Sequence, residues 1–340
     1  MQVVAGILII ILAAALLSVN RILNARAPDT GSGSVELSVA EGSSLGRIAK
    51  QLSEANLIGD IRSFKIAAAL MRADKLMQPG VFLLPRGARN VQIIRHLLKP
   101  GIQTRNVTIP EGLNLREIAG LLGEKLKIDS AEFVRLCHDS TIIRRLGVYA
   151  ASLEGYLFPE TYNFYRNTGA AEIIERMAGL FHREFSDSML ALGAQLGLSR
   201  HSIVTLASII QGEVMNWDEA RLVSAVYHNR LRKRIRLGAD PTIQYIIPDS
   251  PRRLLNRDLK IDSPYNTYKY YGLPPGPINN PGRLALEAAV NPADVDYIYF
   301  VAKGNGSHFF NTDHKGHERD KAKLQKIRRK VAREKRRRGK

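Results

Sequence analysis

The chain has 340 residues, of which 45% are hydrophobic and 24% charged, and its formal net charge is +18. This composition is that of a globular protein with room for two or three domains, and it excludes a mainly disordered chain. The single cysteine, Cys137, excludes an internal disulfide.

The first predicted element is an uncharged apolar helix at residues 3–19. A helix of this length spans roughly 26 Å at about 1.5 Å per residue, close to the hydrocarbon core of a bilayer. Ile22 and Leu23 can extend the helix, so we predict a transmembrane anchor over residues 1–23. A cleaved signal peptide is the alternative, because residues 25–27 (Ala-Arg-Ala) loosely fit a small-x-small cleavage site.

Basic residues follow this segment and none precedes it. Arg21 and Arg26 lie just after the apolar run, so the positive-inside rule by itself places the rest of the chain in the cytoplasm. Residues 24–34 contain the run APDTGSGS and are predicted to be a flexible linker.

A sequence repeat comes next. The pattern Glu-Gly-x-x-Leu-x-x-Ile-Ala-x-x-Leu occurs at residues 41–52 and again at 111–122, each time after an alternating strand. The repeating unit is therefore predicted to be a strand, a glycine turn and an amphipathic helix. Residues 35–104 resemble the strand–helix–helix–strand LysM domains, which bind the N-acetylated sugars of peptidoglycan or chitin. A small α+β packing domain without a ligand is the alternative.

A buried helix is predicted at residues 202–215, because its apolar residues recur at helical spacing. Glu213 follows Ile210 and Ile209 by three and four residues, so its carboxyl group is expected on the same apolar face. Burial of a carboxyl group raises its pKa. Glu213 therefore has the character of a general acid that is protonated near neutral pH.

An ion pair is the structural alternative for this glutamate. Arg230 or Arg234 on the following segment would provide the partner. Gln211 and Glu219 lie off the apolar stripe and are expected to be solvated. From the helix alone, both roles of Glu213 stay open.

The other elements follow from periodicity and from turn residues. They are helix at 170–196, a helix with its N-cap at Asp218, a turn at 240–242, a loop rich in proline and tyrosine at 263–277, helix at 283–290, a buried strand at 297–302 and a hairpin at 304–312.

Three histidines near the C-terminus are candidate site residues. His308 is either a catalytic helper or a loop histidine with satisfied hydrogen bonds, and we favour the second. His314 and His317 have no carboxylate or cysteine partners at useful spacing, so no metal site is predicted.

Residues 315–340 form a basic tail. Between residues 319 and 340 there are thirteen Lys or Arg and two acidic residues, which predicts a solvated, partly frayed helix. The sequence has no helix-turn-helix, zinc-binding or RNA-binding signature, so nucleic acid is not expected to be a partner.

Several motifs together resemble the YceG-like (MltG) family of endolytic peptidoglycan transglycosylases. The resemblance covers residues 35–314, and its glutamate motif ends at Glu213. The usual Glu-Lys-Glu run is here Gln211-Gly212-Glu213, so the first acid of that run is absent. The matching motifs are EGYLFPETY at 154–162, LASII at 206–210, NRL at 229–231, DPT at 240–242, SPYNTY at 263–268 and GLPPGPI at 272–278.

The resemblance implies an α+β catalytic domain over residues 105–314 that needs no cofactor. Such enzymes cleave the β-1,4 bond between N-acetylmuramic acid and N-acetylglucosamine within a strand, and they leave 1,6-anhydro ends. The family's catalytic glutamate corresponds to Glu213. Because the nucleophile is the sugar's own C6 hydroxyl, one acid suffices. Motif matching assigns substrate-binding roles to Asn229, Asp240, Tyr265, Asn266 and Thr267.

The resemblance also implies a place and partners. A peptidoglycan substrate requires the catalytic domain to lie on the periplasmic or external side of the cell inner membrane, against the charge rule at Arg21 and Arg26. The expected partners are glycan strands and cell-wall synthases, because cutting nascent strands sets their length. A non-catalytic peptidoglycan-binding scaffold that uses the repeat at 41–52 and 111–122 is the competing hypothesis.

Overall fold

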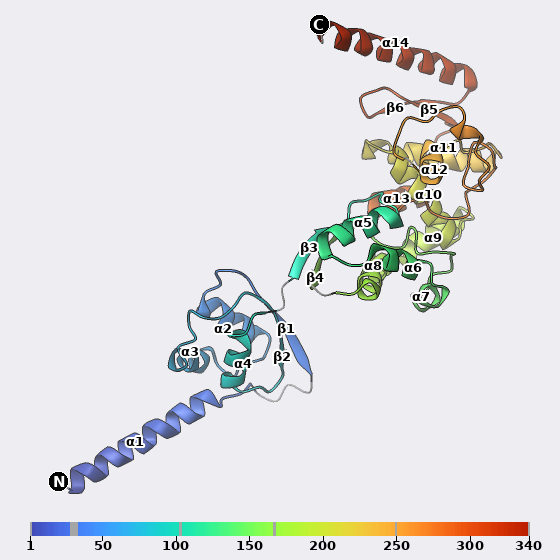
Figure 1. The fold of residues 1–340 in the computed structure, drawn as a ribbon. Helices are drawn as coiled ribbons and strands as arrows, with labels where there is room; N and C mark the ends of the chain where they lie inside the picture. Colours follow the sequence, from blue (N-terminus) through green and yellow to red (C-terminus); the bar gives the residue numbers. More distant parts are fainter. Residues whose placement is uncertain (1, 28–32, 102–103, 166–167, 249, 339–340) are drawn as a thin grey trace. The chain divides into compact units, whose positions relative to one another are not determined.

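The computed structural model describes residues 2–27, 33–101, 104–165, 168–248 and 250–338. The predicted α+β class is confirmed (Figure 1). The chain divides into two compact units. Unit 1 comprises Met1–Asn106 with Asn163–Asn167, and unit 2 comprises Val107–Tyr162 with Thr168–Lys340.

The N-terminal apolar helix is present as α1 (Gln2–Leu23). Its segment Val4–Leu23 has a mean hydropathy of 2.3 and is long and apolar enough to cross a membrane. The residues after it are packed on unit 1 rather than free, since Ala27 is buried and the backbone carbonyl of Ala25 accepts the Asn90 N–H at 2.9 Å. Residues 28–32 of the predicted linker lie outside the described residues, and Ser34, its last residue, already begins the first strand.

Unit 1 is built on the antiparallel pair β1 (Ser34–Val39) and β2 (Gly80–Pro85). Alternation along β1 buries Leu37 and Val39 against the helices and leaves the intervening residues outward. The helices α2 (Leu45–Glu54) and α3 (Ile61–Leu70) lie between the strands in sequence, and α4 (Asn90–Leu97) follows them.

The repeat forms the same local structure twice. Gly42 and Gly112 have φ angles of +74° and +81°, which glycine adopts without steric cost. The helices α2 and α5 (Leu115–Leu126) begin at equivalent leucines, after N-caps from Ser44 and Asn114. The predicted glycine turn and amphipathic helix are thus confirmed in both copies. β3 (Thr104–Thr108) precedes the second copy and pairs with β4 (Thr161–Tyr165).

Unit 2 is mainly helical and is arranged around α10 (Arg200–Glu213). All eight residues from Ile203 to Ile210 are buried, because α10 packs against helices on several sides. The predicted helix is confirmed, although it is enclosed rather than buried along one stripe. The elements around it are α6 (Ser130–Cys137), α7 (Ser140–Arg145), α8 (Ala170–Glu184), α9 (Asp187–Gln195), η1 (Trp217–Glu219), α11 (Ala220–Arg232), α12 (Asp240–Ile246), η2 (Asp258–Lys260), α13 (Arg283–Val290), β5 (Tyr299–Ala302), β6 (His308–Asn311) and α14 (His314–Arg338).

Several predicted boundaries are wrong. Asp218 lies within the short helix η1, which Asn216 caps, and is not an N-cap. Residues 240–242 begin α12 instead of forming a turn, since Pro241 occupies the first turn of the helix, where it needs no N–H partner. The helix at 170–196 is broken at Phe185, and only Val301 of β5 is buried. The helix at 283–290 is confirmed. The hairpin predicted at 304–312 is instead formed by β5 and β6, so residues 304–312 provide its turn and its second strand.

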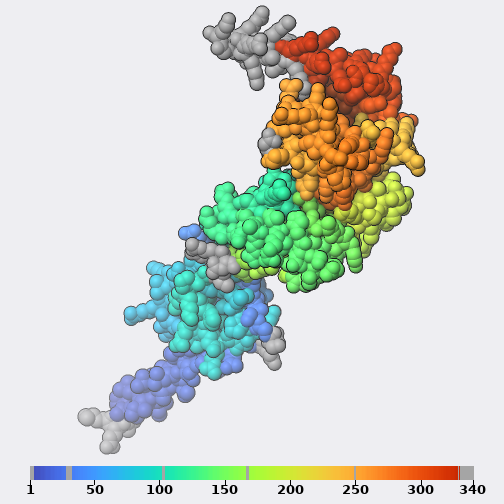
Figure 2. Space-filling view, turned by 45° about the vertical axis from the view of Figure 1, so that its right-hand side comes forward, coloured from blue at the N-terminus to red at the C-terminus, as the bar shows by residue number. Residues whose placement is uncertain are grey.

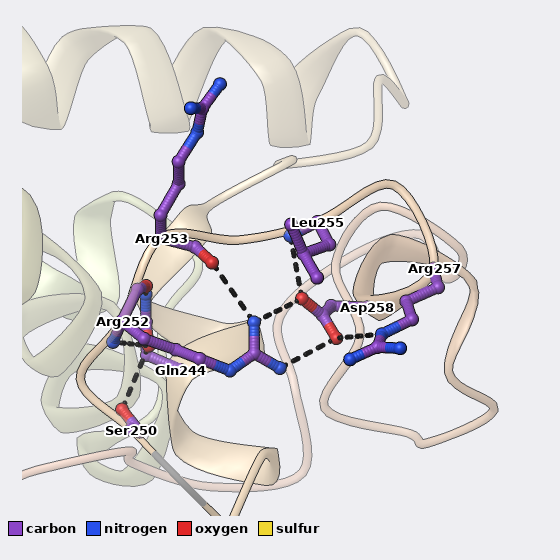
Figure 3. A network of polar contacts seen from close by, with 7 residues as sticks. All are labelled: Gln244, Ser250, Arg252, Arg253, Leu255, Arg257 and Asp258. Atoms are coloured by element: carbon purple, nitrogen blue, oxygen red, sulfur yellow. Dashed lines mark hydrogen bonds and ion pairs between the residues drawn. The ribbon is translucent and has the colours of Figure 1, made fainter.

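An ionic network fixes the loop after α12 (Figure 3). The guanidinium group of Arg252 binds both carboxylate oxygens of Asp258, at 2.7 and 2.9 Å. The Leu255 N–H donates to the same carboxylate at 2.7 Å. Hydrogen bonding to Arg252, more than any other contact, lowers the pKa of Asp258 to about 2. Gln244 joins this loop to α12 through the carbonyl of Arg252, so the segment leading to residues 263–268 is held in place.

Candidate functional site

Glu213 ends α10 and is partly buried. The hydroxyl group of Tyr227, a fully buried residue of α11, donates to its Oε1 at 3.1 Å. Burial is the main cause that raises the pKa of Glu213 to about 7, and the negative charge of Asp240 adds to it. Tyr227, Arg230 and the backbone N–H of Asp240 act in the opposite direction. A carboxyl group in this state gives or takes a proton near neutral pH.

Asp240 is brought beside Glu213 by close packing of α12 on α10. A Cβ atom at Gly212 would lie 2.7 Å from the Cβ of Pro241, so only glycine allows this approach. The hydroxyl group of Tyr268 donates to Oδ1 of Asp240. The two carboxyl groups thus have separate tyrosine donors.

The two acids share a cavity of about 440 Å³. Its walls come from the ends of α10 and α11, the start of α12, the hairpin and the first turns of α14, and the orange and red segments of unit 2 pack together in Figure 2. Acidic groups, cationic groups and aromatic rings all face it. The lining residues are Glu213, Arg230, Gly238, Asp240, Tyr268, Tyr299, Phe300, Val301, Ala302, His308, His317 and Lys321.

The ion pair considered for Glu213 is not found within the described part of the chain. The guanidinium group of Arg230 donates to the backbone carbonyls of Ile298 and Leu237 and lies 5.5 Å from the ring centroid of Tyr299. Arg230 therefore braces the hairpin against α11, and its charge reaches Glu213 only through space.

The other predicted site residues brace the cavity instead of lining it. Asn229 donates its amide to the carbonyls of Val295 and Tyr297, at 2.7 and 2.9 Å. Thr267 accepts the Ala239 N–H at 2.9 Å, next to Asp240.

Buried hydrogen bonds and ring packing by its own side chains hold the loop at 263–268 in place. Asn266 is fully buried and donates to the carbonyls of Leu259 and Ile261. Tyr265 stacks at a tilt on Tyr245, with 5.0 Å between ring centroids. This order presents Tyr268, the last residue of SPYNTY, to Asp240.

Two sequence expectations need correction. The sequence predicts that Glu219 is solvated, but its side chain is 14% exposed and its carboxylate lies 2.9 Å from Nδ1 of His308. The same prediction fails for Gln211, which is partly buried and whose Oε1 accepts the Gly282 N–H at 3.0 Å. Both side chains contact segments remote in the sequence, which helical spacing does not reveal.

Sequence reasoning missed several lining residues. Tyr227 falls one residue after Val226 on the apolar stripe of α11, where it looks like a core residue. Tyr268 could have been predicted, because it is the last residue of the SPYNTY motif. His317 and Lys321 come from the predicted basic tail, and nothing in the tail's composition indicates that its first turns line a cavity.

Comparison with known proteins finds relatives that match most of this chain. Residues 37–323 match the YceG-like family. The endolytic murein transglycosylase of Bacillus subtilis (strain 168) is 32% identical over 305 residues, covering 85% of this chain and 84% of that protein. The endolytic murein transglycosylase of Streptococcus pneumoniae serotype 2 (strain D39) is 26% identical over 320 residues, covering 85% of this chain but 58% of that longer protein.

A solved structure has a similar fold. The crystal structure of a YceG-like protein from Listeria monocytogenes has a TM-score of 0.59 and 27% sequence identity, covering 84% of this chain and 98% of that chain. The family match spans both units and includes Glu213, Asp240 and the hairpin that closes the cavity. On these grounds, the chain belongs to the YceG-like family.

Proposed function

We propose that this protein is an endolytic murein transglycosylase with Glu213 as its catalytic acid and base. The activity is supported by relatives that carry this name. The single observation that carries the assignment to Glu213 is its position on the wall of the cavity, with a pKa raised to about 7 by burial and by Asp240.

In the proposed reaction, the protonated carboxyl group of Glu213 donates its proton to the leaving glycosidic oxygen. The resulting carboxylate then accepts the proton of the muramyl C6 hydroxyl as that oxygen attacks C1. The product is a 1,6-anhydro end on one fragment and a free 4-hydroxyl on the other. No water enters the bond, so a second carboxylate is not needed to activate one.

Asp240 keeps Glu213 protonated in this scheme. Its negative charge disfavours ionisation of Glu213, while the Tyr227 hydroxyl group favours it. This balance lets one group act first as acid and then as base near neutral pH. Thr267 and Asn266 act as positioning residues, because Thr267 accepts the Ala239 N–H just before Asp240 and Asn266 accepts the Tyr268 N–H.

The location and partners belong to the same proposal. α1 acts as a single-pass anchor in the cell membrane, with both units on the external side where murein lies. Residues 35–104 form a LysM-like module that holds glycan strands, and residues 105–314 carry the catalysis. Cell-wall synthases are the proposed protein partners, since cleavage of nascent strands terminates their elongation.

The test is a substitution that removes the ionisable carboxyl group of Glu213 and keeps the size of its side chain. Glu213→Gln is expected to lower the formation of anhydro-ended fragments about a hundredfold or more, as loss of a general acid does. Glu287→Gln is the matched control, because Glu287 is an exposed glutamate of α13 in the same unit. Mass spectrometry of digested glycan strands measures the products, and circular dichroism confirms folding.

The outcomes separate the candidates. If Glu213→Gln still forms anhydro-ended fragments at the wild-type rate, Glu213 is not the catalytic group. If the wild-type protein binds glycan strands and releases no fragments, the non-catalytic scaffold is the better description.

A further inference from the structure

Besides the two acids, the cavity is lined by His308, whose ring is held from behind by Glu219. His308 lies at the start of β6, and its side chain is 10% exposed. The carboxylate of Glu219 lies 2.9 Å from its ring Nδ1 and also accepts its backbone N–H, at 2.9 and 3.2 Å. One carboxylate thus holds both the backbone and the ring of the same residue.

These bonds determine which ring nitrogen is free. An ionised carboxylate only accepts hydrogen bonds, so Nδ1 must carry the proton in the bond to Glu219. Among the described residues, none forms a hydrogen bond with Nε2. In the neutral imidazole, Nε2 therefore has an available lone pair.

Aromatic contacts connect this pair to Glu213. The hydroxyl group of Tyr227 donates to Glu213, and the ring of Tyr227 packs edge to face on Phe300 with 5.9 Å between centroids. Phe300 packs edge to face on His308, with 5.3 Å between centroids. Glu213, Phe300 and His308 all line the same cavity, so the imidazole is part of a packed wall that begins at the acid.

We propose that His308 contacts the glycan, with Nε2 accepting a hydrogen bond from a sugar hydroxyl group or an acetamido N–H, and that Glu219 is its positioning residue. This inference rests on the proposed function and adds a substrate contact from β6, whereas Asp240 comes from α12. Sugars suit such a wall, because hydroxyl groups meet the nitrogen while ring faces meet Phe300 and Tyr299.

Two substitutions at position 308 separate substrate contact from bracing. The amide nitrogen of asparagine can replace Nδ1, so His308→Asn keeps a donor for Glu219 and loses the nitrogen at the Nε2 position. The amide of glutamine reaches the Nε2 position instead, so His308→Gln keeps an acceptor there and loses the donor to Glu219. The two variants thus divide the functions of one ring.

Binding is measured in a protein that does not cut. In the Glu213→Gln background, His308→Asn is expected to weaken binding of a defined glycan oligomer about tenfold. Both variants lose the packing of the ring on Phe300, so His308→Asn, which keeps a donor for Glu219, should show the smaller fall in melting temperature. His308→Gln is expected to bind more tightly than His308→Asn and to melt at a lower temperature. Calorimetric titration with the oligomer and thermal unfolding provide the two readouts.

The opposite pattern would overturn the proposal. If His308→Asn binds as well as its parent, Nε2 makes no contact and His308 only braces β6. The catalytic assignment is judged separately, because it depends on whether Glu213→Gln abolishes cleavage while the binding comparison requires no cleavage.

Discussion

The protonation of Glu213 depends on two neighbours that act in opposite directions. The negative charge of Asp240 raises the pKa of Glu213, and the hydrogen bond from Tyr227 lowers it. Burial raises the pKa more than either neighbour changes it. A general acid works only while it is protonated, so activity should fall as pH rises through about 7.

Substitution of each neighbour should move that limb of the pH profile in a known direction. Asp240→Asn removes the charge that raises the pKa, so activity should be lost at a pH about one unit lower. Tyr227→Phe removes a hydrogen bond to the ionised form, so the loss should occur about one unit higher. Rates of anhydro-product formation measured between acidic and alkaline pH give both midpoints.

The opposite signs provide the control. A general loss of stability would lower activity in both variants without moving the two midpoints apart. Shifts in the same direction would show that another group controls the limb.

Single residues of the site were predictable where local spacing or a motif marked them. Glu213 follows from its position three and four residues after buried isoleucines, and Asp240 from its motif. Both line the cavity. Tyr227, His317 and Lys321 were not predictable, since their relation to Glu213 exists only after α11 and α14 pack around the hairpin.

At the scale of elements, Asn280 joins three segments that are far apart in the sequence. Its Oδ1 accepts the N–H groups of Gly155 and Leu157, at 3.0 and 2.9 Å. Its Nδ2 donates to the carbonyl of Leu113 and to Glu154, at 3.0 and 3.1 Å. One side chain therefore connects the turn before α5, the EGYLFPETY motif and the approach to α13.

Asn280→Ala should be strongly destabilising. It leaves the buried N–H groups of Gly155 and Leu157 without their acceptor, so we expect the free energy of unfolding to fall by about 3 kcal/mol. Asn256→Ala is the control, because Asn256 is exposed and its change should stay within about 0.5 kcal/mol. Urea unfolding followed by circular dichroism measures both. Equal stability of the two variants would contradict the joining role.

The sequence predicts whether most elements are helices or strands, but it does not predict which elements pack against each other. The helices at 202–215 and 283–290 have clear periodicity, and the repeat marks α2 and α5 by its turn glycines. The turn predicted at residues 240–242 is wrong because a proline after an aspartate is compatible with both a turn and the start of a helix. Packing of α12 against Gly212 decides between them.

At the scale of the whole molecule, the end of α1 is packed and hydrogen-bonded to the rest of unit 1. Ile22 and Leu23 pack against the core of unit 1, and the Asn90 side chain donates to the Ile22 carbonyl at 3.0 Å. Asn90 also donates its backbone N–H to Ala25. The last turn of α1 is thus part of the folded unit.

Two truncations test this connection. A variant that begins at residue 21 keeps these contacts, and one that begins at residue 28 loses them. We expect amide hydrogens of α3 and α4 to exchange about tenfold faster in the shorter protein, because local opening becomes easier. Hydrogen exchange with mass spectrometry measures this. Equal exchange in the two proteins would mean that the contacts with α1 add no stability.

The first turns of α14 belong to the cavity, although the sequence predicts this segment to be a solvated basic tail. His317 and Lys321 line the cavity, and Asp320 is buried where the Asn311 amide donates to it at 2.9 Å. A chain that ended at Thr312 would keep Glu213 but lose the side chains of His317 and Lys321 that line the cavity. Just beyond them, Lys323 pairs with the buried Asp320 at 2.7 Å and lies over the ring of Phe309. The part of the chain that supports the cavity therefore extends into the basic helix, at least as far as Lys323.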